Sequence, residues 1–144
     1  MRIPLLVARS CAATVAAALA GAHASAAVPT LLFGASLRDF AVMSASTYLP
    51  ALGVAVCAAP LVANGLREDG FGRLAWQCAL VATMLIAGSE LRWMWMLDLP
   101  FSPPLVWNVV FKALLRGFPG GLAAAGAIVL VLRLLPSVRP GVPA

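Results

Sequence analysis

The feature that most constrains this chain is a long stretch without a charged residue, which runs from Phe40 to Ala63. A helix needs about 20 apolar residues to cross the hydrocarbon core of a bilayer, so this stretch is long enough to span one. Two further apolar runs cover about 74–97 and 117–135. None of the runs alternates apolar and polar residues as membrane barrel strands do, and backbone groups in lipid must be hydrogen-bonded internally. The sequence therefore predicts an all-α integral membrane protein with these three runs as transmembrane helices.

The composition leaves too few charges for a surface that faces water. Of 144 residues, 62% are hydrophobic and 10% are charged, whereas a typical soluble domain has about 45–50% apolar and about 25% charged residues. The net charge of +5 could indicate a nucleic-acid-binding protein, but the arginines stand singly and form no basic patch with interleaved aromatic residues. We therefore expect the partners to be the lipid bilayer and other membrane subunits or copies of this chain, and no nucleic acid.

The first 26 residues have the pattern of a secretory signal peptide. Two arginines give a basic start, a short apolar core follows, and an A-x-A-like cleavage site ends at Ala26. Cleavage after Ala26 would leave a membrane domain at 27–135 with a bundle of three transmembrane helices. The alternative is that residues 1–26 are kept as a first transmembrane helix, because apolar spans follow directly. The bundle would then have four helices.

A shorter segment, at about 105–116, has an amphipathic pattern. Its apolar side chains recur every three or four residues, while Lys112 and Arg116 share another face. This pattern predicts a helix that lies in the outer membrane interface before the last span begins at Gly117. The alternative is one longer, tilted final span whose lysine and arginine side chains reach back to water. Residues 136–144 are rich in proline and glycine, so we expect a flexible tail there.

Basic residues indicate how the chain is oriented in the membrane. Cytoplasmic loops carry an excess of Lys and Arg, and most of the arginines fall inside if the N-terminus, the turn at 64–73 and the C-terminal tail are cytoplasmic. The preference for arginine over lysine, together with abundant alanine, glycine and proline, suggests a GC-rich bacterial genome. We therefore expect a multi-pass protein of the bacterial inner membrane with a cytoplasmic C-terminus.

Small residues recur every four positions in three of the apolar runs. Helices in lipid associate through close van der Waals contact, which such stripes permit. An alanine-rich sequence also produces stripes by chance, so the pattern indicates a compact bundle and not a particular activity. The candidate helix-packing residues are Ala51, Ala55, Ala59, Ala75, Ala79, Thr83, Gly117 and Gly121.

Glu90 and Arg92 are the charges placed deepest in an apolar run, and Trp93 and Trp95 follow them. A charge in the hydrocarbon is costly and marks a functional site by default. At 1.5 Å per residue, however, Glu90 lies about 24 Å from the start of its run, close to the interface where aromatic residues gather. We therefore interpret these residues as interfacial anchors, with an ion or proton site as the alternative. Gln77 is expected to form a hydrogen bond between helices.

The sequence offers no recognisable set of residues for catalysis or for a cofactor. Cys11, Cys57 and Cys78 stand alone, without a Cys-x-x-Cys pair, and His23 is the single histidine. No nucleophile–base pair and no glycine-rich phosphate loop can be assembled. We therefore expect neither an enzyme nor a metal or cofactor site.

The expected function is that of a small, non-catalytic inner-membrane protein, acting as an accessory or assembly subunit of a membrane complex. The packing stripes, the lack of catalytic chemistry and the short loops favour it. One alternative is a self-assembling membrane pore such as a phage holin, which matches in architecture alone. Another is a small transporter or channel with Glu90, Arg92 or Gln77 lining its path.

Overall fold

A computed structural model shows an all-α chain of four long helices and describes residues 3–68 and 70–135, with side chains at 7–56 and 70–135. Each helix is long and apolar enough to cross a membrane, which confirms the predicted class of integral membrane protein. Large apolar side chains cover the outside of the described part and contact the lipid. The helices are α1 (Ile3–Phe33), α2 (Leu37–Glu68), α3 (Phe71–Met96) and α4 (Pro103–Leu134).

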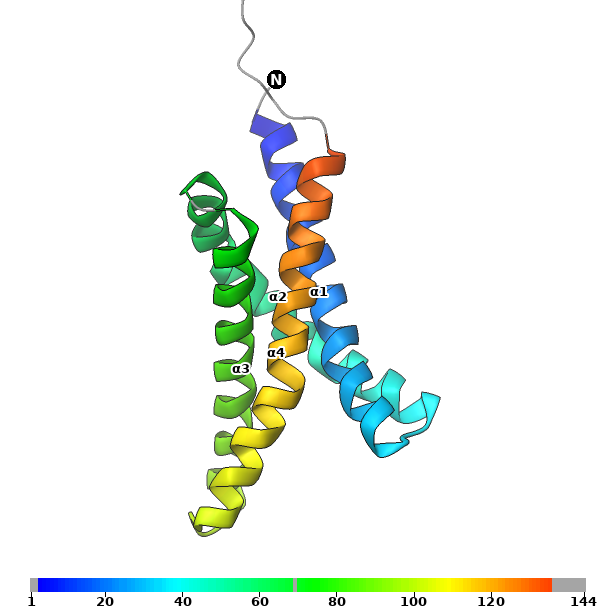
Figure 1. Cartoon of the computed structure of the whole chain (residues 1–144), viewed down its shortest axis with the longest axis vertical. Coiled ribbons are helices and arrows are strands. Elements are labelled where there is room, and N and C mark those ends of the chain that lie inside the picture. The colour runs from blue at the N-terminus through cyan, green and yellow to red at the C-terminus, as the bar shows by residue number, and fades with distance from the viewer. Residues whose placement is uncertain (1–2, 69, 136–144) are drawn as a thin grey trace, which may run out of the picture.

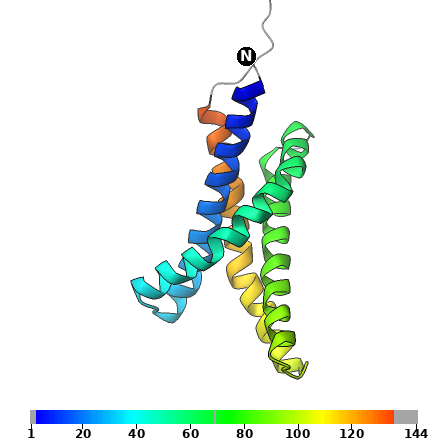
Figure 2. The ribbon, with the colours of Figure 1, turned by 180° about the vertical axis from the view of Figure 1, so that it is seen from behind.

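Helix α4 is the centre of the arrangement. It packs along α1 on one side and along α3 on the other, whereas α2 packs mainly on α1 and makes only a few contacts with α3. Figure 1 shows the helices running alternately down and up. The start of α1, the end of α2 and the end of α4 therefore lie at one end of the molecule. Seen from behind, α2 crosses the other helices obliquely (Figure 2).

The connection between α1 and α2 follows from local sequence. Helix α1 ends at Gly34, which adopts a φ of 65°, and the amide of Ala35 donates to the carbonyl of Thr30 at 3.1 Å. This is the Schellman pattern that glycine favours because it lacks a β-carbon. Ser36 then caps α2, since its hydroxyl accepts from the Asp39 amide at 3.2 Å and the Ser36 amide donates to the Asp39 carboxylate at 3.1 Å. Two otherwise unpaired amides are thus satisfied at the start of α2.

The turn after α3 uses the same geometry without a glycine. Asp98 adopts a φ of 52°, its amide donates to the Trp95 carbonyl at 3.2 Å, and the Leu99 amide donates to the Met94 carbonyl at 3.0 Å. An aspartate tolerates this left-handed backbone better than most residues, although at some cost in energy. Helix α4 begins shortly afterwards at two prolines, whose missing amide hydrogens would have had no helical partner there.

Glycines bring α4 into backbone contact with α3. A β-carbon at Gly117 would overlap the backbone of Thr83, and one at Gly121 would overlap that of Ala79. Two of the small-residue stripes therefore face each other in the structure. This close approach gives the van der Waals contact that drives helix association in lipid.

The other side of α4 approaches α1 just as closely. A β-carbon at Gly120 would lie 3.0 Å from the carbonyl oxygen of Gly21 and 3.2 Å from the β-carbon of Ser25. Because Gly120 and Gly121 are adjacent, α4 fits between two helices at one level. The buried alanines of α1 face this contact region and the neighbouring core: Ala13, Ala17, Ala18, Ala22 and Ala26.

Two helices run across a boundary that the sequence suggested. Helix α1 continues without interruption through Ala26, the expected cleavage position, to Phe33. Helix α4 is continuous from Pro103 to Leu134, so no break at Gly117 separates the segment 105–116 from the last span. Packing on both sides compensates for the glycines and the proline in α4, as membrane helices allow. The expected tail at 136–144 lies outside the described residues.

Candidate functional site

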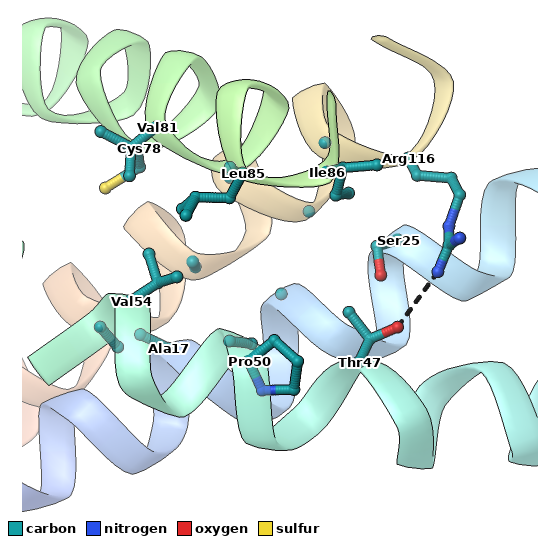
Figure 3. Close-up of a pocket in the computed structure, with 18 of the residues that line it drawn as sticks. Ala17, Ser25, Thr47, Pro50, Val54, Cys78, Val81, Leu85, Ile86 and Arg116 are labelled. Carbon is teal, nitrogen blue, oxygen red and sulfur yellow. Dashed lines mark hydrogen bonds between the residues drawn. The ribbon is translucent and has the colours of Figure 1, made fainter. Parts of the chain in front are cut away.

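All four helices line a cavity of about 350 Å³ in the described part of the chain. Its volume falls within the range of about 300–1,000 Å³ that is usual for small-molecule sites. Ala17 of α1, Val54 of α2, Leu85 of α3 and Arg116 of α4 are among the lining residues. Figure 3 shows them around this space, which we call the cleft.

The cleft has an apolar length and a polar end. Val54, Val81 and Leu85 line the apolar length, whereas Thr47 and Arg116 meet at the polar end (Figure 3). The site therefore combines the two features of many ligand pockets, which are an apolar wall and a few placed polar groups.

Its mouth lies between α2 and α3. The exposed residues of the lining all belong to these two helices, whereas the lining residues of α1 and α4 are buried or half-buried. The weak packing between α2 and α3 explains why the cleft opens there. The exposed lining residues are Ser46, Pro50, Leu85, Ser89 and Trp93.

Arg116 carries the positive charge at the polar end. Its Nη2 donates to the hydroxyl of Thr47 at 3.1 Å, and its Nε is buried without a hydrogen-bond partner. Among the described side chains, no carboxylate lies within ion-pair distance of this guanidinium. An arginine within a membrane-spanning helix is costly unless something compensates its charge.

A second pair of charges lies next to the cleft. The Nζ of Lys112 lies 3.8 Å from Oε2 of Glu90, with side chains that are 49% and 28% exposed. Glu90 lines the cleft and Lys112 does not. Lys112 precedes Arg116 by one helical turn, so both cations lie on one side of α4. Among the described residues, Lys112 has a carboxylate partner, whereas Arg116 has none within ion-pair distance.

The other polar residues predicted from the sequence divide into two sets. Gln77 and Trp93 line the cleft, and Gln77 has a buried Oε1 with no hydrogen-bond partner in the described structure. Arg92 and Trp95 are exposed and lie outside the cleft lining. The structure thus brings Gln77 and Glu90 into one cavity and leaves Arg92 outside it.

The candidate packing residues also divide. Ala75 and Ala79 are buried, and Ala79 lies against α4 as described above. Ala51 and Ala55 instead line the cleft on α2. The side chain of Ala59 lies outside the described residues.

Sequence reasoning missed the position of Arg116 in this site. The sequence pattern places Arg116 with Lys112 on the polar face of the segment 105–116 and does not indicate that its side chain enters a cavity. A signal was present in its neighbour: Gly117 belongs to the stripe that packs inside the bundle. A residue beside that stripe can face the interior, so its polar side chain can enter a cavity.

The cleft contains polar groups that can bind a ligand. Across the described residues, no three His, Cys, Asp or Glu side chains lie close enough together to hold a metal ion. Cys78 lines the cleft as a single thiol. A guanidinium beside an apolar cavity can hold an anionic group in place through charge-assisted hydrogen bonds.

No family model matches this chain, and no curated protein or solved structure matches it either.

Proposed function

We propose that this protein is a non-catalytic, multi-pass membrane protein that acts as an accessory or assembly subunit of a membrane complex. The observation that carries the proposal is the exposure of α2. Only 6% of its candidate span is buried within the chain, against 33% for α1, 17% for α3 and 28% for α4. Helix α2 therefore has the most surface left for a neighbour in the membrane.

The outer face of α2, which consists of Val42, Ala45, Leu49, Gly53 and Val56, is exposed throughout. These residues are spaced three or four apart, so they lie on one side of the helix. Figure 2 shows α2 in front of the other helices in that view. Small residues between larger ones let another membrane helix approach closely. We propose a transmembrane helix of a partner protein as the occupant of this face.

A pair of glycine substitutions tests the docking surface. Gly53 on α2 and Gly88 on α3 are both exposed, and each has open space where a β-carbon would lie. Neither change should therefore disturb packing within the chain. Native mass spectrometry of the tagged protein, extracted gently from its host membrane, should show foreign subunits at a fixed stoichiometry. Gly53→Leu should remove those subunits, because the larger side chain blocks close approach, and Gly88→Leu should retain them.

One result would contradict the accessory function, and another would contradict the docking surface. A homo-oligomer without foreign subunits, together with ion conductance in lipid bilayers, would replace it with the self-assembling pore. Equal loss of partners in Gly53→Leu and Gly88→Leu would show that the outer face of α2 is not the docking surface.

We also propose that the protein keeps residues 1–26 as part of its first span. Arg9 belongs to the basic start of the signal-like pattern, yet its Nη2 donates to the carbonyl of Leu132 at 3.0 Å. That carbonyl lies in the last turn of α4, where it has no partner within the helix. Ala17, Ala18 and Ala22 are at most 2% exposed, so cleavage would uncover part of the core. The intact mass of the purified chain should include residues 1–26, and a mass that lacks them would exclude a four-span protein.

For its place in the cell we propose the bacterial inner membrane, with the N-terminus and the C-terminus in the cytoplasm. The start of α1, the start of α3 and the end of α4 lie at one end of the molecule (Figure 1), and this end carries Arg9, Arg73 and Arg133. Arg2, Arg67 and Arg139 belong to the same segments in the sequence, which makes six arginines there against four basic residues in the other segments. Such an excess is typical of the cytoplasmic side. A phosphatase fused after residue 144 should be inactive and a fluorescent protein fused there should fluoresce. The opposite pattern would reverse the orientation.

A further inference from the structure

We propose that the cleft binds a single-chain anionic amphiphile, with its carboxylate or phosphate head at Arg116 and its apolar chain along Val54, Val81 and Leu85. The site lies on the inner side of α2, whereas the docking surface proposed above lies on its outer face. A result against one proposal therefore does not affect the other.

Charge is the first argument for an anionic ligand. Glu90 lies 3.8 Å from Lys112, and no described carboxylate lies within ion-pair distance of Arg116. The guanidinium is left with a neutral hydroxyl, that of Thr47, as its hydrogen-bond partner. An uncompensated cation inside a membrane bundle is unfavourable, so an anion at this end of the cleft would be stabilised by the excess positive charge.

Hydrogen bonding is the second argument. A guanidinium has five N–H groups in a planar fork that matches a carboxylate or a phosphate. In Arg116 the Nη2 group contacts Thr47, while Nε is buried and donates to no described atom. Figure 3 shows the guanidinium beside Thr47 and Ser25 at one end of the cavity. An anionic head placed there would satisfy the buried N–H and accept further bonds from the fork.

Shape and access are the third argument. The cavity of about 350 Å³ is at the small end of the range for ligand sites, which favours one chain over the two chains of a phospholipid. Apart from Gln77 and the polar end its lining is mainly apolar, and its mouth between α2 and α3 faces the membrane rather than another helix of this chain. An amphiphile dissolved in the bilayer could therefore enter sideways without leaving the lipid.

Trp93 provides a direct readout because it lines the mouth of the cleft. In a chain with Trp76, Trp95 and Trp107 changed to Phe, the fluorescence of Trp93 should be quenched by a long-chain fatty acid that carries bromine in mid-chain. The protein would be held in nanodiscs of neutral lipid at a pH that ionises the acid. The same measurement with the brominated methyl ester should show affinity weaker by about tenfold or more, because the ester carries no charge for Arg116.

Variants locate the head group. Arg116→Gln should weaken binding of the fatty acid by about tenfold or more, and Arg116→Lys should recover part of it. Arg92→Gln is the matched control, since it removes an exposed arginine outside the cleft lining and should leave binding unchanged. Val81→Phe should also weaken binding, because it fills the apolar length while the charge at Arg116 stays.

Other amphiphiles test which head group and how many chains the cleft accepts. Competition by a brominated lysophosphatidic acid would extend the site to phosphate heads, and the fatty acid alone would restrict it to carboxylates; both support the proposal. Equal quenching by the fatty acid and its methyl ester, in the chain that keeps Arg116, overturns the proposal. This comparison needs no substitution at position 116. The proposal is also overturned if the Arg116→Gln variant still binds the fatty acid with unchanged affinity. It is overturned as well if a two-chain anionic phospholipid binds as tightly as the fatty acid.

Discussion

At Gly121 a single hydrogen atom occupies the place where any other residue would have a β-carbon overlapping the backbone of Ala79. Gly126 lies on the same helix, but nothing lies within 4 Å of the corresponding position there. The two glycines have the same propensity and differ in their surroundings. They therefore separate the effect of packing from the intrinsic effect of glycine on a helix.

Gly121→Ala should lower the free energy of unfolding by about 1–3 kcal/mol, because the added methyl group forces α3 and α4 apart. Gly126→Ala should raise it by up to about 1 kcal/mol, because alanine is the better helix former and has open space. Unfolding of both variants by sodium dodecyl sulfate in mixed micelles, followed by circular dichroism, measures the difference. Equal effects would show that α4 does not contact α3 at Gly121.

Asp98 offers a second test at the residue scale. Its left-handed φ of 52° costs a residue with a β-carbon about 1–2 kcal/mol. Replacement by glycine removes this cost, but it also lowers stability by about 0.4–1 kcal/mol, because glycine gives the unfolded chain more conformational entropy. Asp98→Gly should therefore raise the free energy of unfolding by about 0.5–1 kcal/mol. Asp98→Ala keeps the β-carbon and should give no such gain in the same assay. A gain in both variants would assign the effect to the lost charge.

At the scale of elements, α1 and α4 contact each other at their ends as well as along their length. The side chain of Arg9 reaches the last turn of α4 through the carbonyl of Leu132. Cations near a helix C-terminus are favoured by the helix dipole and by the unpaired carbonyls there. Arg133 lies in that turn too, but its side chain is exposed.

Arg9→Gln should lower the free energy of unfolding by about 1 kcal/mol, the usual size of such a bond. Arg133→Gln is the matched control, because it removes an arginine from the same end of the molecule and should change stability less. Thermal unfolding in detergent, read by circular dichroism, compares the two variants. A larger loss for Arg133→Gln would mean that net charge, and not the bond from Arg9, stabilises this end.

At the scale of the whole molecule, α1 forms one wall of the core. Ala17 belongs to a buried cluster with Leu74 and Ala75 of α3 and with Ala125 and Ile128 of α4. Removal of α1 would uncover this cluster and the adjacent wall of the cleft. The remaining helices would keep only the α3–α4 contact as a close packing.

A chain of residues 34–144 should therefore unfold at a clearly lower temperature than the full chain, because the core loses one side. Co-expression of residues 1–33 as a separate segment should restore the stability, since α1 contributes packing rather than chain continuity. Thermal unfolding in detergent measures both effects. A truncated chain as stable as the full one would show that α1 is not part of the core.

Local properties of the sequence are enough to predict the class of protein and the approximate position of its helices. Hydropathy and the need to satisfy backbone groups act locally, so the charge-free stretch from Phe40 to Ala63 is sufficient to predict a membrane helix. The same holds for the small residues that let helices pack closely, of which Gly117 and Gly121 are examples. These properties do not depend on which helix is the neighbour.

The way the faces of the helices meet depends on contacts between distant parts of the chain, which the structure shows. Helix α4 continues through Gly117 because packing on α1 and α3 supports that segment from both sides. Arg116 likewise lies at a cavity shared by four helices, although sequence spacing groups this residue with Lys112. A cavity arises where side chains of separate helices fail to fill the space between them. Its charge and shape therefore depend on relative positions that no single segment specifies.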